Sequence, residues 1–133
     1  MHKLDIITKS SVEFQDITLE IANLVRKNGV KSGVCHLFVP HTTAGITVNE
    51  HADPDVIEDI KMQLEAMVPR HGGYRHAEGN SPAHIKASLM GCSLALLIED
   101  GELVLGTWQG IFFAEFDGPR HRQLFVKIVP DKA

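Results

Sequence analysis

The sequence predicts one α+β domain in which antiparallel strands, arranged as a sandwich-like sheet, carry two or three helices. Two stretches place apolar residues at helical spacing, at 17–28 and 54–68. The second half of the chain instead alternates short apolar runs with tight turns, which is typical of antiparallel strands. A length of 133 residues suits one hydrophobic core, so we expect a single domain over residues 1–133.

Helix boundaries are marked by turn and capping residues. Ser10 or Ser11 supplies capping chemistry before the first helical stripe, and an Asn-Gly pair at 28–29 ends it. An Asp-Pro pair at 53–54 opens the second helix, with aspartate as N-cap and proline in the first turn. A third, shorter helix is expected from a cap at Ser81 to about residue 89.

Strands account for the remaining apolar segments. Residues 4–8 form the first, and the segments 33–39 and 45–48 flank a turn-like HTT, which predicts that these two strands are neighbours. After Gly91, strands are expected at 93–98, 103–105, 108–116 and 124–129, joined by turns at 99–101 and 117–119.

Composition and charge exclude several classes of protein. The formal net charge is -4 and the pI is about 6.0, so the chain lacks the positive field of a nucleic-acid-binding protein. No apolar run approaches the roughly 18 to 20 residues that span a bilayer, and the first residues lack a signal peptide, so we expect a cytoplasmic protein without a membrane partner. Cys35 and Cys92 lie in apolar segments without CxxC spacing and are expected to be reduced core residues.

Histidine is the unusual residue, with eight copies against one Trp and one Tyr. In HAEGNSPAH, His84 falls in the first turn of the third helix, beside N–H groups that bind anions, and His76 and Asn80 can fold back next to it. These groups, together with Ser81, would receive a phosphate. With a third histidine or a carboxylate, the imidazoles would instead hold a divalent metal. The alternative is an exposed polar loop in which His84 caps a helix.

A second block, PHTTAGITVNE, places His41, Thr42 and Thr43 in a turn and Asn49 and Glu50 where a strand ends. Both positions suit the mouth of a cleft. The alternative is local: the threonines bond their own backbone, the Asn-Glu pair belongs to the helix entry, and the histidine is solvated.

The third block joins GTWQG to EFDGPRHR. Trp108 and Gln109 offer a flat ring and a bidentate amide for a pocket wall. Asp117 adds a carboxylate, and Arg120 and Arg122 add two guanidinium groups suited to phosphate. The alternative is a hairpin with a Gly-Pro turn, in which the tryptophan belongs to the core. We favour that alternative for the Gly-Pro pair and leave it open for the arginines.

These blocks resemble the YjbQ-like family of small bacterial and archaeal proteins. The resemblance covers nearly the whole chain and rests on HTTAGITVNE at 41–50, ADPDV at 52–56, HAEGNSPAHIKASLMG at 76–91, SLALLIEDGELVLGTWQGI at 93–111 and EFDGPRHR at 115–122.

The resemblance implies a compact α+β fold, a homotrimer and a weak ability to make thiamine phosphate. That reaction joins a pyrimidine-methyl diphosphate to a thiazole phosphate and releases pyrophosphate. An enzyme for it neutralises the leaving group and shields a cationic fragment from water. The chain offers Arg120, Arg122 and the helix start at Ser81 for phosphate, Trp108 as a wall, and Glu50 or Asp117 for a cation.

Our first hypothesis is therefore an enzyme acting on a phosphorylated heterocycle in a pocket between subunits. Its catalytic residues are His41, Glu50, His76, Asn80, His84 and Asp117; its substrate residues are Thr42, Thr43, Asn49, Ser81, Trp108, Gln109, Arg120 and Arg122; and its metal ligands are His41, His76 and His84. The metal would be zinc or magnesium, and its affinity would fall as the pH drops through about 6.5, because ligating imidazoles are neutral. The alternatives are a module that binds a metabolite or metal without turnover, and a scaffold trimer whose histidines are incidental.

Overall fold

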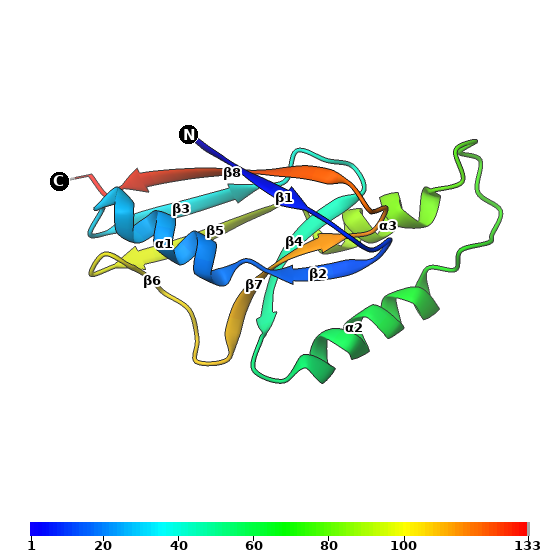
Figure 1. The fold of residues 1–133 in the computed structure, drawn as a ribbon, viewed down its shortest axis with the longest axis horizontal. Coiled ribbons are helices and arrows are strands. Elements are labelled where there is room, and N and C mark those ends of the chain that lie inside the picture. Colours follow the sequence, from blue (N-terminus) through cyan, green and yellow to red (C-terminus); the bar gives the residue numbers. More distant parts are fainter. Residues whose placement is uncertain (133) are drawn as a thin grey trace.

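Antiparallel strands and three helices make up the computed structural model, which describes residues 1–132 (Figure 1). The predicted α+β class is confirmed. In chain order the elements are β1 (His2–Ile7), β2 (Glu13–Asp16), α1 (Thr18–Asn28), β3 (Gly33–Phe38), β4 (Ala44–Glu50), α2 (Pro54–Met67), α3 (Ser81–Met90), β5 (Ser93–Glu99), β6 (Glu102–Leu103), β7 (Gln109–Glu115) and β8 (His121–Pro130).

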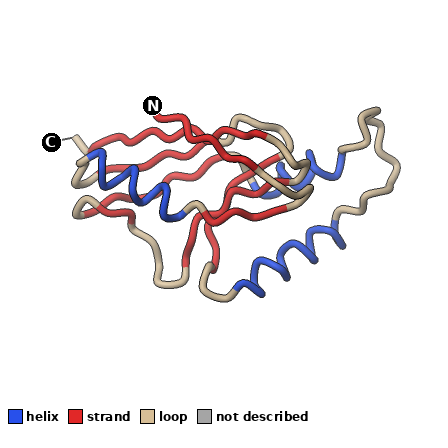
Figure 2. Tube along the Cα trace, in the orientation of Figure 1, coloured by secondary structure: helices blue, strands red, loops and turns tan. Residues whose placement is uncertain are grey.

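The strands form two sheets around a main core, and a smaller buried cluster lies between α3 and β7. The five-stranded sheet has the order β1-β8-β3-β5-β6 and the three-stranded sheet the order β2-β7-β4 (Figure 2). Leu124 of the first sheet, Phe113 of the second and Ile21 of α1 are all fully buried in the same cluster. Because strand side chains alternate between faces, β3 sends Cys35 and Leu37 inward to this core and leaves His36 and Phe38 outside.

The predicted neighbour relation between the strands at 33–39 and 45–48 is wrong. β3 has β5 on one edge and β8 on the other, whereas β4 pairs with β7 in the second sheet. Beyond β3, the N–H of Val39 donates to the carbonyl of Cys92 at 2.8 Å, which extends the pairing on the β5 side. With both edges filled, β3 has no place for β4, and the segment 41–43 carries the chain to the other sheet.

The predicted cap of the first helix, at Ser10 or Ser11, is also wrong. A short strand, β2, which the sequence did not predict, separates Ser10 and Ser11 from α1. Glu13 accepts hydrogen bonds from the N–H groups of Lys9 and Ser10 at 2.6 and 2.9 Å, so these residues form the turn between β1 and β2. The first turn of α1 is held instead by Asp16, which accepts from the Thr18 N–H at 3.0 Å.

The second helix begins as predicted. The Asp53 side chain accepts a hydrogen bond from the Asp55 N–H at 2.9 Å, and Pro54 occupies the first turn. Gly29 has the positive φ of 84° expected at the end of α1. In the described chain, no helix combines the length and the hydropathy needed to cross a membrane.

The two cysteines differ from one another. Cys35 is fully buried, and burial raises the pKa of its thiol to about 11. Cys92 is exposed where α3 turns into β5, so its predicted place in the core is wrong. The apolar character of GCSLALLI suggested that the whole segment is a buried strand, but its first residues belong to the turn before the strand.

Close packing between β3 and β8 predicts the effect of a small substitution. A methyl group added at Gly33 would overlap the Val129 carbonyl oxygen, which is backbone that cannot rotate away. We expect Gly33→Ala to lower the free energy of unfolding by about 1–3 kcal/mol in urea denaturation. Gly73→Ala is the control, because nothing lies within 4 Å of its added methyl group. Equal stability of the two variants would contradict this packing.

Candidate functional site

A pocket of about 590 Å³ opens where the β3–β4 segment, the β7–β8 turn and the start of α3 meet. We call it the His41 pocket. Eight of the residues that the sequence singled out line it, and they come from three separate stretches of the chain: His41, Thr42, Thr43, Asn80, His84, Asp117, Arg120 and Arg122.

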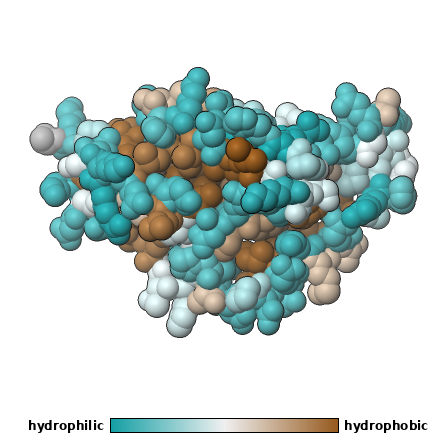
Figure 3. Space-filling model, in the orientation of Figure 1, coloured by the Kyte–Doolittle hydropathy of each residue, from teal (hydrophilic) through white to brown (hydrophobic). Residues whose placement is uncertain are grey.

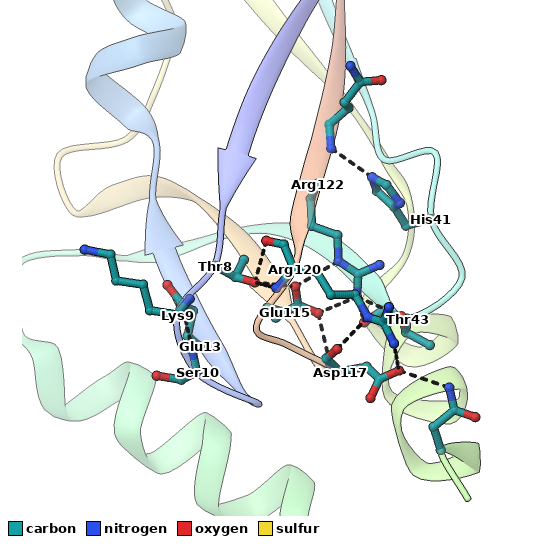
Figure 4. A network of polar contacts seen from close by, with 12 residues as sticks. Thr8, Lys9, Ser10, Glu13, His41, Thr43, Glu115, Asp117, Arg120 and Arg122 are labelled. Carbon is teal, nitrogen blue, oxygen red and sulfur yellow. Dashed lines mark hydrogen bonds and ion pairs between the residues drawn. The ribbon is translucent and has the colours of Figure 1, made fainter. Parts of the chain in front are cut away.

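An ion pair between Glu115 and Arg122 forms the buried base of this site (Figure 4). Glu115 is 0% exposed and Arg122 5% exposed. The Arg122 Nε donates to one carboxylate oxygen at 2.8 Å and a terminal nitrogen donates to the other, while Thr8 donates its hydroxyl to Glu115 at 2.7 Å. Burial acts to raise the pKa of Glu115, but the hydrogen bonds from Arg122, Asp117 and Thr8 outweigh it and lower that pKa.

The buried pair limits what Arg122 can offer a ligand. Its terminal nitrogen also donates to the Thr43 hydroxyl at 2.7 Å, so two edges of the guanidinium are occupied within the protein. The Thr43 hydroxyl therefore takes part in the hydrogen-bond network of Arg122 and does not bond its own backbone. Sequence patterns did not assign a role to Glu115 or Thr8. The available signal was a single carboxylate inside the apolar run IFFAEF, which is rarely buried without a partner.

Asp117 and Arg120 form a second, more exposed pair at the rim. Arg120 donates to the Asp117 carboxylate at 3.0 Å, and the Asn80 amide donates to the same oxygen at 3.0 Å. Burial acts to raise the pKa of Asp117, but the bonds from Asn80 and Arg120 and the charge of Arg122 lower it. The Arg120 side chain is half exposed, so it can turn from Asp117 to an incoming anion.

His41 is a neutral hydrogen-bond donor in this geometry. Its Nε2 accepts the backbone N–H of Gln123 at 2.9 Å, which assigns the ring proton to Nδ1. Burial and the nearby charge of Arg122 lower the pKa of the imidazole. A proton on Nε2 would also break the bond from Gln123, so the neutral tautomer fits both observations.

The other two predicted histidines pack against each other. The rings of His76 and His84 meet edge to face with centroids 5.3 Å apart. His84 borders the His41 pocket, whereas His76 and Ser81 border the cavity beside it. The N-cap of α3 is Asn80 and not Ser81, and it makes no side-chain capping bond because its amide is turned toward Asp117.

A three-histidine metal centre is not formed by the described chain. Among residues 1–132 no three His, Cys, Asp or Glu side chains come together as a group that could hold an ion. The Nε2 of His41 is occupied by Gln123, which removes the lone pair that a metal would need. Within one chain, His41, His76 and His84 therefore do not come together as a ligand set.

Four predicted residues lie at the far end of β4 and β7. The register pairs Ala44 with Glu115 at the pocket end and Glu50 with Gln109 at the other, six residues further along β4. These ends are about 20 Å apart at a rise of roughly 3.4 Å per residue. Asn49, Glu50, Trp108 and Gln109 therefore do not reach the His41 pocket of their own chain.

Polar groups at this far end make local contacts. Glu50 accepts from the Asp53 N–H at 3.2 Å, and Gln109 accepts from the Gly106 N–H at 2.7 Å. The side chain of Asn49 accepts from the next residue's N–H at 2.7 Å. Trp108 is 63% exposed, so it does not belong to the core of this chain.

Fold and pocket together define a small α+β protein with a polar cavity lined by histidine, arginine and aspartate side chains. The chain belongs to the UPF0047 YjbQ-like family, whose model matches residues 2–131. It is 52% identical to UPF0047 protein MJ1081 of Methanocaldococcus jannaschii, over 99% of this chain and 96% of that one. It is 46% identical to UPF0047 protein YugU of Bacillus subtilis, over 95% and 96% of the two chains.

Solved structures of relatives share the fold. A YjbQ/UPF0047 protein of Clostridium acetobutylicum superposes with a TM-score of 0.95 at 53% identity, over 97% of this chain and all of that one. A conserved hypothetical protein of Thermus thermophilus superposes with a TM-score of 0.90 at 44% identity, over 97% of this chain and 100% of that one. The names of these relatives state no activity.

The environment of His41 predicts that the free energy of unfolding depends on pH. Because its folded-state pKa is lowered, the unfolded chain binds a proton at this residue first as the pH falls. The stabilising contribution is complete above about pH 6.5 and is lost as the pH drops from there toward the folded pKa. NMR titration of the imidazole should give a pKa below 6.5, and His41→Gln should remove this part of the pH dependence of unfolding. A measured pKa at or above 6.5 would contradict the tautomer and the burial.

Proposed function

We propose that this protein is an enzyme that binds a phosphorylated small molecule in the His41 pocket. One observation carries the proposal: the HTT, NSPAH and DGPRHR segments, far apart in the sequence, line one cavity. Its volume of about 590 Å³ lies in the range of pockets for small molecules. A neutral N–H donor, a second histidine, an ionised carboxylate and a half-exposed arginine then face one ligand.

Each group has a distinct proposed task. Arg120 leaves Asp117 to pair with phosphate oxygens, and His41 donates its Nδ1–H to the same group. His84 lies in the first turn of α3, at the positive end of the helix dipole, and donates a proton to an oxygen of the leaving diphosphate. Asp117 remains ionised and orients Asn80.

The reaction that we propose is the alkyl transfer of thiamine-phosphate synthesis. The bond between the pyrimidine methylene carbon and the diphosphate oxygen breaks, and its electron pair leaves with pyrophosphate. The thiazole nitrogen then supplies the pair for the new carbon–nitrogen bond. Arg120, the His41 N–H and the start of α3 would neutralise the leaving group. A divalent metal remains a prediction that elemental analysis of the purified protein tests.

A binding module without turnover is the second candidate. It is favoured by the pairing of both arginines inside the site, since a site already neutralised attracts an anion less strongly. Calorimetry with the two thiamine precursors, run beside a turnover assay, separates the candidates. Tight binding without product would support the module.

We also propose that the protein works as a homotrimer in the cytoplasm. A neighbouring subunit would bring its far end, with Glu50, Trp108 and Gln109, to the His41 pocket. The high exposure of Trp108 supports this role, because large exposed aromatic side chains are common at protein interfaces. The free thiols of Cys35 and Cys92 are consistent with a reducing compartment.

Substitution of His84 tests the enzymatic proposal. We expect His84→Gln to lower kcat for thiamine-phosphate formation by about 100-fold, since a lost proton-transfer group commonly costs 10² to 10⁴. His2→Gln is the matched control, because His2 is exposed on β1 and does not line the His41 pocket. Unchanged turnover in His84→Gln would refute the assignment.

Mixed oligomers test the shared site. We expect His84→Ala and Glu50→Gln homotrimers to be inactive, and co-expressed mixtures to recover part of the activity, because some interfaces then join two unsubstituted halves. Light scattering gives the subunit number of each preparation. Failure of every mixture to recover activity would show that one chain holds the whole site.

A further inference from the structure

A second cavity, of about 600 Å³, lies behind the wall that Asn80 and Asp117 form in the His41 pocket. It is open to solvent on one side and is lined by the end of α2, the loop of residues 68–80, the start of α3 and the turn between β1 and β2, where Figure 1 shows the loop leading away from the sheets. We call it the α2–α3 chamber. Hydrophobic side chains are visible in the gap between β2 and α2 (Figure 3), and the loop itself is mostly hydrophilic.

Lys86 is the most unusual residue of this chamber. Its side chain is 4% exposed, and its ammonium group donates to Glu65 of α2. An ammonium group has three N–H donors, and within residues 1–132 Glu65 is the acceptor found for it. A buried donor without an acceptor is costly, so the two remaining N–H groups indicate an acceptor that the chain does not itself provide.

Asn80 shows a complementary feature on the shared wall. Its Oδ1 is buried and has no hydrogen-bond partner among the described residues. The orientation of the amide is fixed, because its nitrogen donates to the ionised Asp117 at 3.0 Å and the reverse orientation would set oxygen against oxygen. An acceptor without a partner therefore lies at the boundary between the two cavities.

The charges and the aromatic lining of the chamber limit the chemical class of its ligand further. Arg70 lies 3.6 Å from the same Glu65 carboxylate, so two cations share one anion in the chamber. Asp117, on the shared wall, is already paired with Arg120. Tyr74 and Phe116 supply aromatic surface on the lining. The volume suits a ring-bearing small molecule.

We propose that the α2–α3 chamber is a second ligand site, which binds a small molecule through an anionic oxygen group at Lys86 and a hydrogen-bond donor at Asn80. The anionic group is a phosphate or a carboxylate. The site uses neither His41 nor His84, so it goes beyond the proposed function and stands or falls separately from it.

NMR titration of ¹⁵N-labelled protein with inorganic phosphate and, separately, with acetate tests the proposal. We expect at least one anion to shift the amides of Gly72 and Gly79, which line the chamber, and the Kd to weaken about tenfold or more in the double variant E65Q/K86M. This variant removes both charges, so neither is left unpaired. Arg75→Gln is the control, because Arg75 lies on the same loop outside the chamber lining, and its Kd should equal the wild-type value.

Equal affinity in the wild type and E65Q/K86M, or shifts confined to the residues around His41, would overturn the proposal. A second measurement uses the unsubstituted protein, in case the double variant does not fold. The side-chain ¹⁵N resonance of Lys86, assigned with Lys86→Arg, should move during the same titration. A resonance that does not respond to either anion would also overturn the proposal.

Discussion

The buried ion pair of Glu115 and Arg122 is the interaction on which the site depends. Glu115 ends β7 of the three-stranded sheet, and Arg122 lies at the start of β8 in the five-stranded sheet, so the pair joins the two layers at one corner. Thr8 and Thr43 bind the same two side chains. Desolvation makes an isolated buried charge expensive, and removal of one partner from such a pair costs about 3–5 kcal/mol. The surrounding hydrogen bonds make the burial tolerable.

Three of the candidate groups stand at fixed offsets from this network. His41 precedes Thr43 by two residues, Asp117 follows Glu115 by two, and Arg120 precedes Arg122 by two. These three groups are therefore each held by a short piece of backbone whose other end is anchored in the buried network. Loops anchored in this way hold polar groups in place before a ligand arrives, which is the condition for electrostatic catalysis.

Local sequence patterns predicted the helix boundaries of this protein better than they predicted how its strands pair and its side chains meet. The Asp-Pro start of α2 and the glycine after α1 follow from capping chemistry within a few residues. The separation of β3 from β4 depends on β8, more than 80 residues later, and no local pattern contains that pairing. The same holds for the site. Residue types indicated His41, His84 and Arg120, but the pairing of Arg122 with Glu115 and the distance to Glu50 appear only in the folded chain.

A double-mutant cycle on Glu115 and Arg122, measured by urea unfolding, tests the central claim most directly. If the pair organises this corner, Glu115→Gln and Arg122→Met should each be strongly destabilising, and the double variant should be less destabilised than the sum, with a coupling energy of about 1–3 kcal/mol. Losses that simply add would contradict the account, because they would show that the two side chains stabilise the fold independently.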